Sequence, residues 1–573
     1  MIRTFAQHRI RTQRELTGSL WEFTALSGPH EEESYRVLTP CCWESHPDFA
    51  SYRGEGLYRT QFWAGGNTRL EFKGVSHTAT VYVDGQEVAR HYNAYTAFDV
   101  ILHELEAGEH TLEIRADNRF SEESALHVPN DYMSYGGVSR PVVLESLSEA
   151  WIPSLHVTTH CENGSWQAVV SVQADNLTGE AIEAEVRLTL TDRHGVKAVT
   201  QTGGTDASAR LVIPANKSVT ETVTVSYPGV MEWNEKTPVL YEMTAELVRD
   251  GVVIDDLTDR IGFREITIEG KKLLLNGKPL AIRGVCRHED HPQYGCALPA
   301  EAMAYDLNLI KDLGANSVRT SHYPNDEVFL DLCDELGILV WEENHARGLS
   351  EEQMRNPNFE RQAEEVIREM IPAHYNHPSI YIWGILNECA SDTEYGKECY
   401  RRQLELIRSL DESRPTSFAS CKFKTDICFG LPEVVSYNIY PLWYHNTPPA
   451  EYLDDLYTWI QQETGGAGKP FMITEIGAGG LYGYRNPEHS HWTEDYQAEV
   501  LERQVTAVLD YPDCMGVYIW QFADTRISEE WWGGRPRTMN NKGLVDEFRR
   551  RKMAYDVVKR LFRRAAAEDG QKE

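Results

Sequence analysis

The sequence predicts a multidomain protein in which two all-β domains precede an α/β domain, a C-terminal (β/α)8 TIM barrel. Three observations support this fold class. The 573 residues exceed what a single hydrophobic core accommodates. Short alternating apolar runs separated by turn residues occupy the first part of the chain, and apolar strands alternate with amphipathic helices in the rest. We therefore expect three domains, over residues 1–150, 151–263 and 264–573.

The two N-terminal domains are expected to be antiparallel β-sandwiches. In the first, runs such as TRLEFKG and TATVYVDG end in Gly or Asp-Gly turns, which indicates a jelly-roll-like sandwich. In the second, AEVRLTLTDRHG and VTETVTVSYPG end in turn residues at immunoglobulin-like spacing. The second domain contains no concentration of catalytic residue types.

After residue 263 the pattern changes to parallel βαβ units. Helical stretches are expected at 357–375, 394–409 and 494–510, between apolar strands. The count and the length fit a (β/α)8 barrel. The eight strand candidates are 279–286, 316–323, 338–344, 379–388, 416–420, 434–440, 470–477 and 515–522.

Composition restricts the possible partners. Lys and Arg total 56 against 88 Asp and Glu, and the formal charge of −32 opposes binding to nucleic acid and to anionic membranes. The basic run 549–564 has apolar residues at helical spacing, so we interpret it as the solvated face of a C-terminal helix. No apolar run is long enough to span a bilayer.

The amino-terminal segment and the cysteines favour an intracellular setting. MIRTFAQHRIRTQRELTG has neither an apolar core nor a small-residue cleavage pattern, so we expect a cytoplasmic protein. The eleven cysteines are an odd number without compact disulfide or metal-ligand spacing. We expect reduced, mostly buried thiols, with no metal and no cofactor.

Polar residues follow several barrel strands at the end where barrel active sites lie. Strand four ends in Asn387-Glu388 and strand seven in Thr474-Glu475. The third strand ends in the run 342–345, and the first continues through His288, a candidate substrate-binding residue. A single strand-end glutamate is equally well explained as a loop cap or an ion-pair partner, but a pair in these two strands favours catalysis.

Two carboxylates facing each other across a barrel mouth suit glycoside hydrolysis. One donates a proton to the leaving oxygen and the other attacks the anomeric carbon. The acid then needs a raised pKa, whereas the nucleophile is kept ionised by hydrogen bonds and cations.

Three segments carry a resemblance to a known family. Residues 316–343 and 376–388 look like the two signatures of glycoside hydrolase family 2, and NDYMSYGGVSRPVVLE at 130–145 resembles the end of that family's first domain. The resemblance spans the chain. It implies a sugar-binding-like sandwich, an immunoglobulin-like domain and a catalytic barrel, assembled as a homodimer or homotetramer.

Residue by residue, the resemblance implies a retaining mechanism. Glu388 would be the acid/base and Glu475 the nucleophile. Asn387 would hydrogen-bond the sugar 2-hydroxyl, and Tyr440 would position the nucleophile. Trp520 resembles the aromatic floor of the sugar subsite.

The sugar is indicated by the segment after strand eight. Asn540 and Lys542, in RPRTMNNKG, look like the β-glucuronidase motif that binds the carboxylate of a uronic acid. An ammonium and an amide are suitable donors to such an anion. The alternative is that Lys542 is a surface charge. Asp131 resembles a family aspartate that reaches the sugar hydroxyls around C4.

Two departures from the family pattern affect specificity. Arg347 occupies a position where a small or apolar residue is usual, and it could bond an axial C4 hydroxyl or the carboxylate, which would favour galacturonide. Alternatively, Arg347 pairs with Glu342 or Glu343. The loop after strand three is short, so the leaving-group side should be open.

These observations predict an exo-acting β-hexuronidase whose partners are small-molecule or oligosaccharide β-uronides. Of the candidate substrates, we expect β-glucuronide to be preferred, with β-galacturonide as the main alternative and β-galactoside as the third candidate. A non-catalytic carbohydrate-binding protein is the alternative from another class.

Overall fold

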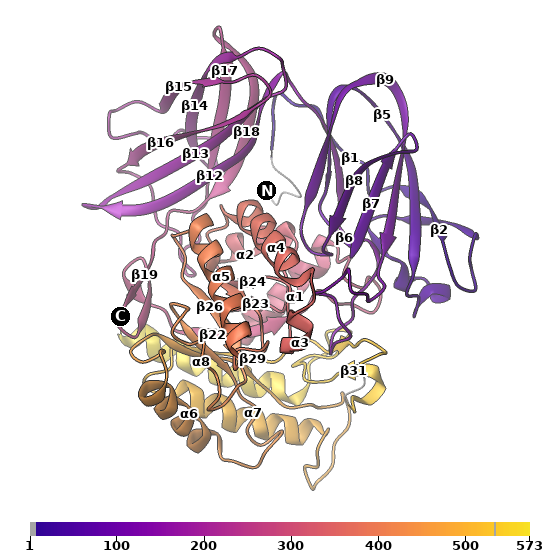
Figure 1. Ribbon diagram of the computed structural model, residues 1–573. Helices are drawn as coiled ribbons and strands as arrows, with labels where there is room; N and C mark the ends of the chain where they lie inside the picture. The colour runs from indigo at the N-terminus through magenta and orange to yellow at the C-terminus, as the bar shows by residue number, and fades with distance from the viewer. Residues whose placement is uncertain (1–6, 532–533, 573) are drawn as a thin grey trace.

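The computed structural model describes residues 7–531 and 534–572, and places two β-sandwiches side by side along one side of a barrel (Figure 1). Expectations for the first six residues and for residue 573 lie outside the described residues. In the described part of the chain, no helix is long and apolar enough to cross a membrane.

The N-terminal sandwich is built from a large antiparallel sheet and a small one. In β7 every second residue is buried, because successive side chains of a strand point to opposite faces. The large sheet contains β1 (Gln13–Glu15), β2 (Leu20–Ala25), β3 (Ser34–Leu38), β5 (Glu55–Phe72), β7 (Thr78–Val83), β8 (Gln86–Tyr92), β9 (Phe98–Asp117) and β11 (Val142–Ser146). The small sheet contains β4 (Cys41–Cys42), β6 (Val75–Ser76) and β10 (Gly137–Val138).

The second sandwich packs a three-stranded sheet on a four-stranded one around a core of its own, as expected for an immunoglobulin-like domain. The first sheet contains β12 (Ala150–Glu162), β13 (Ser165–Asn176) and β16 (Ser218–Tyr227). The second contains β14 (Ile182–Asp192), β15 (Asp206–Ile213), β17 (Tyr241–Arg249) and β18 (Val252–Ile261).

Eight parallel strands close into a barrel, which confirms the predicted fold class. Nearly every strand residue is buried, since helices cover the outside and side chains fill the inside. Each strand lies within the predicted range or within one residue of it. The strands are β22 (Ile282–Arg287), β23 (Ser317–Thr320), β24 (Leu339–Glu343), β25 (Ile380–Ile385), β26 (Thr416–Ser420), β27 (Val435–Asn438), β28 (Phe471–Ile476) and β29 (Gly516–Ile519).

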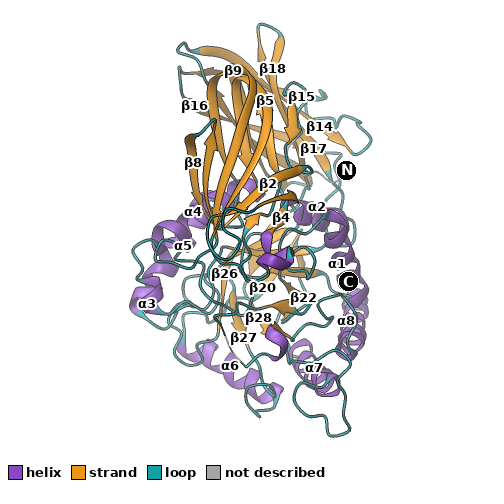
Figure 2. Ribbon diagram, turned by 90° about the vertical axis from the view of Figure 1, so that its right-hand side faces the viewer, coloured by secondary structure: helices purple, strands orange, loops and turns teal. Residues whose placement is uncertain are grey.

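Helices surround the barrel (Figure 2), and the three predicted helical stretches are confirmed as α4, α5 and α7. Thr393 and Thr493 cap α5 and α7 with their side chains, which explains where these helices begin. The helices are α1 (Ala300–Leu313), α2 (Glu327–Leu336), α3 (Glu351–Met354), α4 (Phe359–His374), α5 (Glu394–Leu410), α6 (Pro449–Glu463), α7 (Glu494–Leu509) and α8 (Met553–Lys572).

Two small sheets and one interdomain contact complete the frame of the site. β19 (Ile266–Glu269), β20 (Lys272–Leu275) and β21 (Lys278–Pro279) precede the barrel, and β30 (Thr525–Arg526) pairs with β31 (Met539–Asn540) after its last strand. Arg140 of the first sandwich donates to Glu289 at 2.8 Å and to the Pro324 carbonyl at 2.8 Å. This contact fixes the sandwich against the barrel mouth.

Candidate active site

A cavity of about 190 Å³ opens at the carboxyl ends of the barrel strands. Its walls come from several barrel strands, from the loop after β29, and from the first sandwich, which contributes one aspartate. The lining residues are Asp131, Arg347, Glu388, Cys421, Asn438, Tyr440, Tyr444, Glu475, Trp520, Arg535 and Lys542.

Glu475, in β28, is held by two hydrogen-bond donors. Arg319 Nη1 donates to Oε1 at 2.9 Å, and the Tyr440 hydroxyl donates to Oε2 at 2.6 Å. Both oxygens are therefore fixed in orientation, and both donors favour the ionised carboxylate.

Glu388 follows β25 in strained backbone. Its φ is +54°, and that of Leu386 is +47°, a region that non-glycine residues rarely adopt and that recurs at active sites. Asn438 Nδ2 donates to its Oε1 at 3.0 Å, and Arg347 Nη2 lies 3.6 Å from Oε2. The Glu388 side chain is 17% exposed against 5% for Glu475, so Glu388 lies nearer the open side of the cavity.

The raised pKa at the active site lies on a different glutamate from the one that the sequence led us to expect. We expected the raised pKa on the acid, but burial and then the charge of Glu388 raise the pKa of Glu475 to about 8, although Arg319, Tyr440 and Arg347 oppose the shift. The reason is that Glu475 is the more buried of two neighbouring carboxyl groups. Geometry rather than pKa therefore has to distinguish the roles of the two glutamates.

Arg319 links the two glutamates through Asn387. Its guanidinium donates to Asn387 Oδ1 at 2.7 Å and binds both oxygens of Glu343 at 3.1 Å. The amide of Asn387 is thereby oriented, and its buried Nδ2 has no hydrogen-bond partner in the described part of the protein. A free donor is thus available beside both carboxyl groups.

Lys542 is a buried cation without a matching anion. It is 1% exposed, and its ammonium lies 3.0 Å from the Tyr444 hydroxyl and within 5.6 Å of the ring centres of Tyr440, Trp443 and Tyr444. Burial lowers its pKa, and Arg535 lowers it further. Over residues 7–531 and 534–572, no carboxylate lies within ion-pair distance of this nitrogen. Such a site favours an incoming anion.

Asp131 extends from the first sandwich towards the same cavity. Asn540 Nδ2 donates to its Oδ2 at 3.2 Å, Arg347 lies 3.3 Å from Oδ1, and Arg535 lies 3.6 Å from Oδ2. Burial raises the pKa of Asp131, but Arg347, Arg535 and Lys542 together hold it below its usual value. Asp131 is therefore ionised and ready to accept from hydroxyl groups.

Arg347 does not pair with Glu342 or Glu343, the alternative that the sequence left open. Glu342 binds His374, and Glu343 binds Arg319 and His322, so neither of these glutamates pairs with Arg347. Arg347 instead donates to Asn130 Oδ1 at 2.8 Å and lies between Asp131 and Glu388. It thus connects the acid/base candidate to the first sandwich.

Trp520 lines the cavity and rests on buried aromatic rings. The His322 ring stacks on it with centroids 5.0 Å apart, and the His288 ring meets it edge-on at 5.4 Å. His288 is not among the residues that line the cavity. Its Nδ1 lies 3.1 Å from the Tyr323 hydroxyl, and its ring packs on Tyr132. His288 therefore supports the floor and lies behind it.

Sequence reasoning named most of these residues but missed Arg319, Asn438, Tyr444 and Arg535. Arg319 is a fully buried arginine in a barrel strand, and such a residue requires anionic partners. The sequence carries this signal as an arginine inside the apolar strand candidate 316–323. The sequence carried no comparable signal for Tyr444 and Arg535, because they lie in loops.

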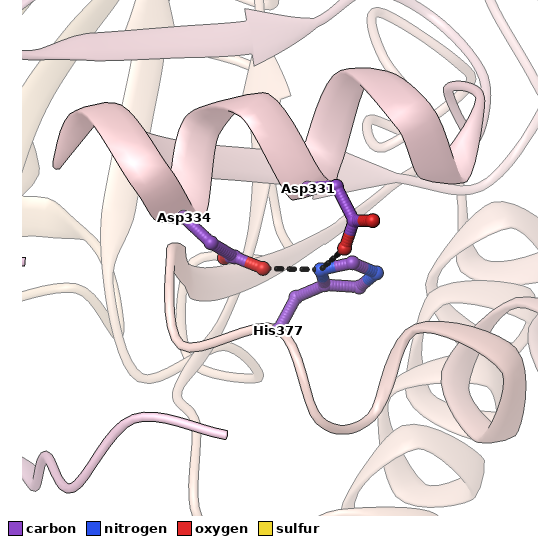
Figure 3. Close-up of side chains that lie close together, drawn as sticks. All are labelled: Asp331, Asp334 and His377. Carbon is purple, nitrogen blue, oxygen red and sulfur yellow. Dashed lines mark hydrogen bonds and ion pairs between the residues drawn. The ribbon is translucent and has the colours of Figure 1, made fainter. Parts of the chain in front are cut away.

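A separate acidic cluster lies at the opposite end of the barrel (Figure 3). Asp331 and Asp334 point from α2 towards His377, whose Nδ1 is 2.6 Å from Asp334 and 4.0 Å from Asp331. Arg260 Nη2 also lies 2.8 Å from Asp331. Because cationic side chains already neutralise these carboxylates, the cluster is an ion-pair network.

Comparison with known proteins agrees with this geometry. The family model described as glycosyl hydrolases family 2, TIM barrel domain, matches residues 266–566, and the model described as glycosyl hydrolases family 2 matches residues 150–264. The chain belongs to glycoside hydrolase family 2. This confirms the resemblance and the expectation of a family 2 enzyme.

Several family 2 proteins are similar to this chain along most of its length. A beta-galacturonidase from Eisenbergiella tayi, solved with bound galacturonate, is 56% identical, with a TM-score of 0.95 over 98% of this chain and 99% of that one. A beta-glucuronidase from Bacteroides fragilis is 28% identical over 94% of this chain and 80% of its own length. This chain spans 61% of the length of a curated relative from Formosa agariphila.

Proposed function

We propose that this family 2 enzyme is a retaining, exo-acting β-hexuronidase that prefers β-galacturonides. The observation that carries the proposal is Lys542, a buried ammonium that lines the catalytic cavity and has no carboxylate partner among the residues that the structure describes. A uronic acid supplies the missing anion, whereas a neutral sugar leaves the charge uncompensated. Asn540 donates to Asp131, which lines the same cavity as Lys542.

The roles of the two glutamates follow from their surroundings. Glu475, fixed by Arg319 and Tyr440, is the nucleophile, because two donors orient both its oxygens. Glu388, on the more open side, is the acid/base, because leaving group and water must reach it. The free Nδ2 of Asn387 donates to the sugar 2-hydroxyl, and Trp520 is the floor under the ring.

The reaction takes place in two displacements. Glu475 attacks the anomeric carbon while Glu388 gives its proton to the glycosidic oxygen, so the bond to the leaving group breaks and a glycosyl ester forms. Glu388 then takes a proton from water, which displaces Glu475 and releases a β-uronic acid. When substrate binds, the ammonium of Lys542 pairs with the uronate carboxylate. The negative charge that the substrate brings into the cavity is therefore compensated and does not act on Glu475 without a countercharge.

The preference at C4 is proposed on two grounds. Arg347 lies between Asp131 and Glu388, and we assign it as the donor to the axial C4 hydroxyl. The protein that is 56% identical to this chain is a beta-galacturonidase. β-Glucuronide, which sequence analysis placed first, is now the second candidate, favoured by the relatives named beta-glucuronidase at 28–30% identity.

Initial rates on p-nitrophenyl β-D-galacturonide, β-D-glucuronide and β-D-galactoside test the proposal. We expect the galacturonide to be hydrolysed fastest, with Glu475→Gln as the blank, and the first sugar released to be the β-anomer by NMR. Preference for the galactoside would refute the role of Lys542. Release of the α-anomer would refute retention.

A homodimeric or homotetrameric assembly and a cytoplasmic location remain predictions. Light scattering of the purified protein tests the first, and fractionation of the source cells tests the second.

A further inference from the structure

One residue of the catalytic cavity has no role in the mechanism above. Cys421 directly follows β26 and lines the cavity together with Glu388. The Glu388 amide donates to the Ala419 carbonyl at 2.9 Å, so the end of β26 runs beside the acid/base residue. Cys421 is exposed, whereas Cys389, the other cysteine next to Glu388, is buried.

The position of Cys421 relative to Glu388 determines which part of a substrate it can meet. The acid/base residue must reach the glycosidic oxygen, so the leaving group lies on its side of the cavity. The groups assigned to the sugar, Lys542, Asn540 and Asp131, come from the hairpin after β29 and from the first sandwich. Cys421 lies in neither of these elements. It is close enough to Glu388 for the charge of that carboxylate to raise the pKa of its thiol.

We infer that Cys421 forms part of the wall against which the leaving group packs, and that a substituent on its sulfur obstructs that subsite. This inference rests on the proposed function, because it takes the direction of the leaving group from the assigned roles of the glutamates. The leaving group that fits an uncharged, polarisable thiol is an apolar or aromatic one. Burial of the sulfur and the charge of Glu388 raise the pKa of the thiol, so it is uncharged at neutral pH.

Reversible labelling of the thiol tests the inference. A methanethiosulfonate reagent transfers its S-alkyl group to the thiol, so a protein–S–S–alkyl bond forms, the thiosulfonate S–S bond breaks, and the sulfinic acid leaves with the thiol proton. The methyl and benzyl reagents differ in the size of the group they add. Dithiothreitol removes either group, which separates obstruction from damage to the protein.

We expect peptide mass spectrometry to find the label on Cys421 and on Cys161, the other exposed cysteine, which lies in the second sandwich. The benzyl label should lower kcat/KM for p-nitrophenyl β-D-galacturonide by roughly tenfold, the methyl label should lower it less, and dithiothreitol should restore it. Cys161→Ser is the matched control and should remain sensitive. Cys421→Ser, compared with its own untreated rate, should be insensitive.

Each other result refutes the inference. If Cys421 carries the benzyl group and the rate is unchanged, the thiol does not face the leaving group. If Cys421 resists labelling because its raised pKa leaves little thiolate, Cys421→Phe adds a ring at the same position, and an unchanged kcat/KM in that variant refutes the inference. If Cys421→Ser is inhibited equally, another site is responsible. Failure of the untreated enzyme to hydrolyse any uronide is a separate result, because it refutes the proposed function whatever the labelling shows.

Discussion

At one end of the barrel, Asp331 and Asp334 lie between His377 and Arg260. At the mouth, Lys542 lies among aromatic rings, and no carboxylate of the described residues is within ion-pair distance of it. Both clusters bury charge, but only the first is neutralised by its own side chains. An ion-pair network that is complete serves stability, since removing one partner leaves a buried charge unpaired. An incomplete ion-pair network lowers the stability of the fold unless a ligand supplies the missing charge. A buried charge of this kind therefore indicates a functional site. The predictions below test that distinction.

The largest expected effect is at the mouth. Glu475→Gln should lower kcat on the preferred uronide by roughly 10⁴-fold, because the amide cannot form the glycosyl ester. Folding should survive, because burial already raises the pKa of Glu475 to about 8 and Arg319 keeps its pair with Glu343. Steady-state kinetics and thermal unfolding of the same preparation measure both quantities. Glu145→Gln is the control, because Glu145 is a buried glutamate of the first sandwich that pairs with Arg11 and Arg69 and should affect stability alone.

At the opposite end of the barrel the effect should be on folding. Asp334→Asn should lower the free energy of unfolding by about 3–5 kcal/mol, because His377 then loses a carboxylate 2.6 Å away. Urea denaturation measures this loss. Asp455→Asn, which breaks the exposed pair with Lys424, should cost less than about 1 kcal/mol. A folded Asp334→Asn protein with greatly reduced kcat/KM would contradict the division between the two clusters.

Lys542→Met should have the opposite effect to Asp334→Asn, because it should lower activity and spare stability. Loss of the carboxylate partner should lower kcat/KM on the uronide by roughly 30-fold, about 2 kcal/mol, with no comparable loss on the β-galactoside. The melting temperature should be unchanged or higher, because an unpaired buried ammonium is replaced by an apolar side chain of similar length. Equal loss of activity on both substrates would mean that the substitution damages the site as a whole.

The sequence predicted the barrel and its two glutamates because these depend on local pattern and strand order. All eight strands are short apolar runs, and a residue at the carboxyl end of such a strand must face the mouth. The partners of those glutamates were harder to predict. Asp131 meets Asn540 across 409 positions of sequence, and this contact depends on how the first sandwich docks on the barrel. The raised pKa of Glu475 likewise depends on its burial, which no spacing encodes.

The last expected effect is a pH dependence of stability that has opposite signs in two regions. Although burial lowers it, the neighbouring carboxylates Asp334 and Asp331 raise the pKa of His377 to about 9. Its stabilising contribution is then complete below the unfolded-state value of about 6.5 and is lost as the pH rises towards 9. His77, buried in the first sandwich between β6 and β7, is the opposite case, because burial lowers its pKa to about 4. Its contribution is complete above pH 6.5 or so and is lost as the pH falls.

Unfolding free energies of wild type and of each variant, measured in urea between pH 4 and 9 or so, isolate these contributions, because all other titrating groups cancel in the difference. The difference between wild type and His377→Gln should shrink above about pH 6.5, and that between wild type and His77→Gln should shrink below it. A His377 difference that is constant over the alkaline range would mean that the imidazole is neutral in the folded protein. Asp331 and Asp334 would then lack one of their cations, and the contrast with Lys542 would no longer hold.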